Sequence, residues 1–124
     1  MVTNALSPMR VFESLQDLVP KKGTTGFMSS GQGSVSSNTN GGHEVYRGLK
    51  AASDMYMKSH AACHAGEPRT LLLMVPGWMH TDSGGPDAPL SIEQGIPKVV
   101  NVMLSQQGKL GLQNLDREGK TVPW

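Results

Sequence analysis

Two residues with complementary chemistry, Tyr46 and Lys50, stand four residues apart where the sequence indicates the start of a helix. A spacing of four places a phenol and an ammonium on one face of a helix. A phenol alone ionises near ~10, and a neighbouring ammonium stabilises its ionised form. Ser30, in a Ser-rich stretch before this helix, could hold a carbonyl or alcohol oxygen against the phenol. These side chains suit a proton transfer that accompanies the transfer of a hydride.

The spacing of Tyr46 and Lys50 is not specific by itself. Many helices carry a half-buried Tyr and a solvated Lys at this distance for structural reasons. The elements around the pair must therefore decide whether it has a catalytic role.

Helical and β-prone segments alternate along the chain. Apolar residues recur at helical spacing over residues 2–19 and 43–64, the second through Val45, Leu49, Ala52 and Tyr56. Residues 24–29 form a short β-prone run that delivers Ser29 and Ser30 to a loop, and residues 34–42 are a Ser/Asn/Gly-rich loop. Tyr46 and Lys50 therefore lie in the first turns of the second helix.

The second part of the chain continues the alternation. Residues 70–75 are continuously apolar, as in a strand buried on both faces. Ser91 and Gln94 match a capping box, which predicts a helix to about residue 104 with a kink at Pro97, and residues 108–116 form a last predicted strand. The order of helix and strand, repeated three times, predicts an α/β fold with half of a doubly wound parallel sheet.

Length and composition exclude several classes of function. The 124 residues are expected to form one partial domain, 1–124, with a net charge of +1 and scattered basic residues. We expect no nucleic-acid partner and no membrane segment, since there is neither a basic patch nor a long apolar run, and we place the chain in the cytoplasm. A metal site is not expected, because Cys63 is the only Cys and His60 with His64 reads as a polar helix face.

Five motifs in order make the whole chain resemble the C-terminal half of a short-chain dehydrogenase/reductase, closest to the C-factor-like or sniffer-like carbonyl reductases. The motifs are SSGQGS at 29–34, YRGLK at 46–50, PGW at 76–78, TDSGG at 81–85 and GKTVPW at 119–124. The resemblance implies an NAD(P)-dependent oxidoreductase that acts on a small carbonyl or alcohol substrate. Whether the cofactor is NAD or NADP stays open.

The resemblance also implies a role for each matching residue. Tyr46 would donate or accept the proton, Lys50 would favour its ionised form and hold the nicotinamide ribose, and Ser30 would orient the substrate oxygen. Asn4 matches the family's helix Asn, which keeps a water-linked proton path to the Lys. A set of three residues, Pro76, Gly77 and Thr81, matches the loop that meets the nicotinamide carboxamide and the phosphates.

The sequence departs from the family pattern in two ways. Leu49 stands where Ser usually precedes the Lys, and Ser53 and His60 replace apolar residues, changes expected to weaken packing more than chemistry. The Gly-rich turn that cradles the cofactor phosphates is absent from the 124 residues, and neither Thr25-Gly26 with Gly31 and Gly33 nor the Gly31 to Ser36 stretch has the required spacing. We therefore expect the catalytic half of the fold without the cofactor half, and little activity from the chain alone.

Two functions remain open from the sequence. The first is the oxidoreductase, and the alternative is a non-enzymatic remnant of the same fold that acts through an interaction surface. Homo-oligomerisation through helices 2–19 and 43–64 is expected for either. A serine hydrolase fails, because the chain has no G-x-S-x-G elbow.

Overall fold

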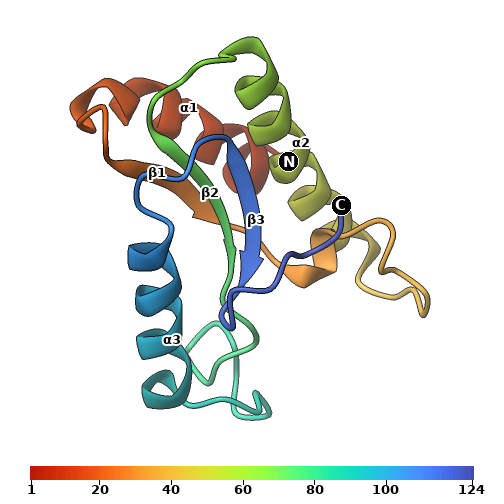
Figure 1. Ribbon diagram of the computed structural model, residues 1–124. Helices are drawn as coiled ribbons and strands as arrows, with labels where there is room; N and C mark the ends of the chain where they lie inside the picture. Colours follow the sequence, from red (N-terminus) through yellow and green to blue (C-terminus); the bar gives the residue numbers. More distant parts are fainter.

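The most apolar run of the sequence forms the central strand of the sheet, β2 (Thr70–Val75), which is buried along its whole length. The computed structural model describes residues 1–124. β1 (Thr24–Met28) and β3 (Leu112–Asp116) pair with β2 on either side, and both pairings are parallel. The predicted α/β class with a parallel sheet is confirmed, and helices lie on both sides of the sheet (Figure 1).

One face of the sheet is covered by α1 (Ser7–Leu15) and α2 (Glu44–Cys63). Met9 and Phe12 of α1 and Met57 of α2 form a buried cluster with two residues of β2, Leu71 and Leu73. α2 therefore has a fixed position against the sheet, and its first turns reach toward the end of β1.

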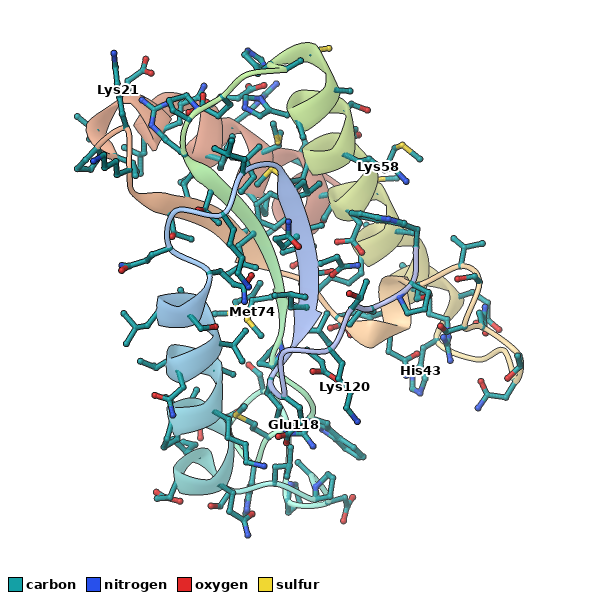
Figure 2. All side chains as sticks on the ribbon, viewed as in Figure 1. Lys21, His43, Lys58, Met74, Glu118 and Lys120 are labelled. Carbon is teal, nitrogen blue, oxygen red and sulfur yellow. The ribbon has the colours of Figure 1, made fainter.

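The opposite face is covered by α3 (Ile92–Ser105), whose Val99 and Val102 pack on Leu72 and Met74 of β2. Met74 lies between the sheet and α3 in Figure 2. The predicted capping box is present, because Ser91 and Gln94 each accept a hydrogen bond from the other's backbone N–H. The helix continues through Pro97 without ending there.

Two predicted elements need correction. The predicted helix over 2–19 is divided into a π-helical turn (Val2–Leu6), α1, and a 3₁₀ turn (Gln16–Leu18). The last strand begins only at Leu112, after Gly108 and Gly111, which adopt positive φ angles of 81° and 82°. Glycine adopts this conformation without steric cost, so residues 108–111 form turns in place of a strand.

The buried face of α2 also differs from the prediction. Val45 is 78% exposed and Tyr56 is 36% exposed, whereas the buried positions are Ser53, Asp54, Met57 and His60. The apolar spacing therefore indicated the helix correctly but placed the wrong face toward the sheet.

The end of the chain is fastened to the loop that precedes α2. The backbone N–H of Ser36 donates to the carbonyl oxygen of Trp124 at 2.9 Å, and Lys58 of α2 lies 4.4 Å from the centroid of the Trp124 ring. Figure 2 shows Lys58 on the same side as the chain end. None of the helices is both long enough and apolar enough to cross a membrane.

Candidate functional site

The carboxyl ends of β1 and β2 lie side by side at one edge of the sheet. The backbone N–H of Ser29 donates to the carbonyl oxygen of Met74 at 2.8 Å, which extends the pairing one residue beyond β1. Ser30 therefore follows one strand while Pro76 follows its neighbour. Ligands of open parallel sheets bind at this edge, so the topology brings these predicted site residues to a suitable place.

Ser30 caps a short 3₁₀ turn, η3 (Gly31–Gly33). Its side-chain oxygen accepts a hydrogen bond from the backbone N–H of Gln32 at 3.2 Å. A serine hydroxyl both accepts and donates. The Ser30 hydroxyl can therefore still donate its proton to another oxygen while the turn holds its position.

Tyr46 and Lys50 lie in the first two turns of α2, as predicted. Tyr46 is 46% exposed, and the Lys50 Nζ lies 6.0 Å from the centroid of its ring. The same Nζ donates to the carbonyl oxygen of Met28 at 3.2 Å. Lys50 therefore connects the helix that carries the phenol with the strand end that precedes Ser30.

Asn4 lies in the π-helical turn at the start of the chain. Its side chain is exposed, and its carbonyl oxygen lies 2.9 Å from the Ser53 hydroxyl, one turn after Lys50 on α2. The structure brings Asn4 to the helix of the Tyr-Lys pair, with no hydrogen bond to Lys50 itself.

The loop after β2 carries the three remaining predicted residues. Gly77 adopts a φ of 90°, which favours glycine, and a Cβ there would lie 2.5 Å from the Arg117 side chain. The Thr81 hydroxyl accepts from the backbone N–H of Gly84 at 2.9 Å, so it shapes the loop. An open hollow of about 600 Å³ lies over this loop and is lined by His80, Thr81, Asp82, Gly85, Pro86 and Ile92.

No hydrogen bond joins the loop residues Pro76, Gly77 and Thr81 to Tyr46 or Lys50. The end of β1 is instead held by a residue that the sequence analysis did not identify, Asp54, whose Oδ1 accepts from the Ser29 hydroxyl at 2.5 Å. Burial raises the pKa of Asp54, while the Ser29 hydrogen bond and the charge of Lys50 lower it. Asp54 stands four residues after Lys50 and so continues the spacing that links Tyr46 to Lys50, but the sequence does not indicate that it is buried.

His60 does not belong to a polar helix face, which corrects the prediction for the His60 and His64 pair. His60 is only 6% exposed, its ring meets Phe12 of α1 edge-on at 4.8 Å, and it stacks on His64 at 4.0 Å. Burial, followed by the charge of His64, lowers its pKa. No group of three or more His, Cys, Asp or Glu side chains is placed to hold a metal ion.

Comparison with known proteins gives relatives in both sequence and structure. The chain is 32% identical over 123 residues to C-signal of Myxococcus xanthus, covering 98% of this chain and 74% of that protein. A structure from Burkholderia multivorans with bound NADP, described as a short-chain dehydrogenase/reductase, is 54% identical with a TM-score of 0.96. A carbonyl reductase from Pseudomonas aeruginosa in complex with NADP is 31% identical with a TM-score of 0.88.

The match to the two solved structures covers nearly all of this chain but only part of each of the two proteins. Each covers 99% of this chain, whereas the chain covers 53% of the Burkholderia multivorans protein and 54% of the Pseudomonas aeruginosa protein. The chain thus spans about half the length of these structures. No family model matches the chain.

Proposed function

Because the chain belongs to the short-chain dehydrogenase/reductase family, we propose that it contributes the catalytic site of an oxidoreductase that interconverts a small carbonyl compound and its alcohol. The observation that carries this proposal is the placement of Tyr46 and Lys50 on α2 beside the end of β1, where Ser30 follows. The substrate class rests on the similarity to a carbonyl reductase.

In the reducing direction, Tyr46 donates the proton that completes the alcohol. The carbonyl carbon receives a hydride and the carbonyl oxygen receives the phenol proton, so the C=O π bond breaks, a C–H and an O–H bond form, and the substrate gains two electrons. The Ser30 hydroxyl donates a hydrogen bond to the same oxygen, which stabilises the negative charge that develops on it. The hydrogen bond from the Gln32 N–H to the Ser30 oxygen supports this role, because the Ser30 hydroxyl is only the acceptor in it and its proton stays free to be donated.

Lys50 acts on Tyr46 through charge. An ammonium near a phenol favours the phenolate that remains after proton donation, and Lys50 lies on the same helical face one turn away. Asn4, whose backbone already contacts α2, is proposed to keep the water-linked path that returns a proton to this site.

NADP fits the residues at this edge of the sheet in part. Lys50 and Tyr46 would hold the nicotinamide ribose, and Pro76, Gly77 and Thr81 would meet the carboxamide and the phosphates. The open hollow lined by residues between His80 and Ile92 provides room for such a group beside this loop. When bound, the reduced nicotinamide supplies the hydride. We propose NADP over NAD, because two similar structures contain NADP.

The assay uses two proteins. One is the 124-residue chain at millimolar NADPH, and the other is a fusion that adds the preceding half of the Burkholderia multivorans protein, which is 54% identical over the shared region. NADPH oxidation is followed with a panel of aliphatic and aromatic aldehydes and ketones. Turnover by the fusion is expected, with weak or no turnover by the chain alone. If neither protein oxidises NADPH with any member of the panel, the proposal is wrong.

The non-enzymatic alternative is favoured by three departures from the family pattern on α2, at Leu49, Ser53 and His60. In that case the surfaces of α1 and α2 would bind a protein. The fusion assay decides between the two, because a site without function would stay inactive when the Gly-rich phosphate-binding turn is supplied. We propose a cytoplasmic location for either function, which cell fractionation tests.

A further inference from the structure

A buried carboxylate lies one helical turn beyond Lys50, outside the set of residues that the proposed reaction uses. Asp54 is 6% exposed, and its Oδ1 accepts the hydroxyl of Ser29, which is itself 4% exposed. A buried carboxyl group is costly unless hydrogen bonds compensate for the lost water. Its presence at this position therefore calls for a specific partner, and Ser29 is that partner.

Lys50 and Asp54 hold consecutive residues of the same strand end. Lys50 donates to the carbonyl oxygen of Met28, and Asp54 accepts from the side chain of Ser29. The next residue is Ser30. Two charged side chains, one turn apart on α2, thus fix the backbone immediately before the hydroxyl that the proposed mechanism requires.

The 3₁₀ turn after Ser30 also packs closely against Asp54. A Cβ at Gly33 would lie 2.9 Å from the Asp54 Oδ2 and 3.0 Å from the backbone carbon and Cβ of Lys50. The absence of a side chain at Gly33 is what lets the 3₁₀ turn approach α2 so closely. Asp54 therefore contacts the chain on both sides of Ser30.

We propose that Asp54 is a positioning residue, which acts through Ser29 and the turn at Gly33 to set the place of the Ser30 hydroxyl relative to Tyr46. This inference rests on the proposed oxidoreductase function. Asp54 does not touch the reacting atoms. Its effect on the reaction passes through the geometry of the β1 end.

The test compares Asp54→Ala with Asp54→Asn. Alanine removes the acceptor for Ser29, whereas asparagine keeps an oxygen of the same size and position. Ser29→Ala removes the same hydrogen bond from the other side and covers the case in which Asp54→Ala does not fold. Glu44→Ala, which removes an exposed acid from the same helix, is the control.

The first measurement is amide hydrogen exchange of the 124-residue chain without cofactor. The amides of Ser29, Gln32 and Gly33 are hydrogen-bonded in the structure. In Asp54→Ala and Ser29→Ala these amides are expected to exchange about tenfold faster relative to those of β2, the effect of losing one hydrogen bond to a charged group. Asp54→Asn and Glu44→Ala are expected to keep the wild-type rates. Unchanged local exchange in both Asp54→Ala and Ser29→Ala overturns the inference, whether or not the protein is an enzyme.

The second measurement uses the active fusion and corrects each rate for the folded fraction. Asp54→Ala is expected to lower kcat at least about tenfold with little change in the KM for NADPH, and Asp54→Asn is expected to restore most of it. A kcat that stays at the wild-type value while local exchange rises shows a structural role only and overturns the inference. An inactive wild-type fusion, by contrast, identifies failure of the proposed function, and the exchange data still decide whether Asp54 fixes the strand end.

Discussion

α2 carries two tyrosines, Tyr46 and Tyr56, of which only Tyr46 stands one turn before Lys50. Tyr56 therefore serves as the control for substitutions of Tyr46. In the active fusion, Tyr46→Phe is expected to lower kcat by about 10²- to 10⁴-fold, the usual contribution of a general acid-base group. Tyr56→Phe, which removes the other phenol of α2, is expected to retain nearly all activity. Steady-state rates of carbonyl reduction check this, and equal effects of the two substitutions would show that Tyr46 has no special role.

His60 gives the fold a predictable dependence on pH. Its pKa is lowered, first by burial and then by the charge of His64, against the opposing charges of Glu13 and Glu67. The unfolded chain therefore binds a proton more readily than the folded one. The contribution of neutral His60 to the free energy of unfolding is complete above its ordinary pKa of 6.5. This contribution is lost as the pH falls from 6.5 through the lowered pKa of the folded state.

The variant His60→Leu is expected to remove this dependence, because leucine keeps an apolar side chain against Phe12 and cannot take up a proton. It also removes the buried Nε2, which has no hydrogen-bond partner, and this gain of about 1 kcal/mol is expected at every pH. The advantage of the variant over the wild type should grow further as the pH falls below 6.5, where only the wild type gains a proton at this position. Urea unfolding at a series of pH values measures the difference. His80→Asn, at an exposed loop position, is the control, and parallel pH profiles for wild type and His60→Leu would contradict the argument.

Residue spacing found Tyr46 and Lys50 because both lie on one helical face, a relation that the sequence displays directly. Asp54 continues the same spacing but was not identified, since a charged residue is normally expected at the surface. Its burial depends on Ser29 and Gly33, which reach it only after β1 has paired with β2. Such a contact between distant segments cannot be deduced from one sequence.

Among the elements, the 3₁₀ turn η3 offers the sharpest test, since two of its residues are glycines in different surroundings. A Cβ at Gly33 would lie 3.0 Å from the backbone of Lys50, which cannot move aside, whereas one at Gly31 would meet only Val75 at 3.8 Å. Gly33→Ala is therefore expected to cost about 1 to 3 kcal/mol of stability, as overpacking usually does. Gly31→Ala is expected to change stability by less than about 0.5 kcal/mol. Urea unfolding of both variants checks this, and equal stabilities would show that η3 does not press on α2.

The elements themselves were predictable to different degrees. The strand over residues 70–75 was predicted with its observed bounds, because an apolar run ended by Pro76 and Gly77 leaves little choice. The helix start at Ser91 was predicted from its capping box, which is a local hydrogen-bond pattern. The π-helical turn at 2–6 and the buried face of α2 were not, because both are set by packing against other parts of the chain.

The sheet of the molecule has two edge strands, because β1 and β3 each pair only with β2. The outer side of β3 is partly covered by the end of the chain, where the backbone N–H of Val122 donates to the carbonyl oxygen of Asn114 at 2.8 Å. A groove between α1 and β1 is lined by Pro8, Val11, Phe12, Leu15, Val19 and Phe27 together with polar residues. Leu15 and Leu18, near the end of the first helical segment, are 51% and 78% exposed. The half of a doubly wound sheet that the sequence predicted is therefore present with an exposed apolar edge.

An unpaired strand beside an apolar groove favours pairing with another chain. We therefore expect the 124-residue chain to self-associate or to unfold with low cooperativity, and to bind NADPH weakly, because backbone N–H groups of a Gly-rich turn normally hold the phosphates. Sedimentation velocity, urea unfolding and NADPH fluorescence measure these three properties. Two matched variants locate the interface, Met28→Lys at the β1 edge and Met55→Lys on α2, since both residues are exposed, at 47% and 59%.

Met28→Lys is expected to shift the chain toward monomer, because a charge at a strand edge opposes pairing, whereas Met55→Lys is expected to leave self-association unchanged. The opposite result would place the interface on the helices over residues 2–19 and 43–64, as the sequence alone suggested. A monodisperse wild-type monomer that unfolds cooperatively and binds NADPH with micromolar affinity would contradict the prediction as a whole. The open edge of β1 would then be tolerated by the fold, and the residues after β2 would suffice to hold the cofactor.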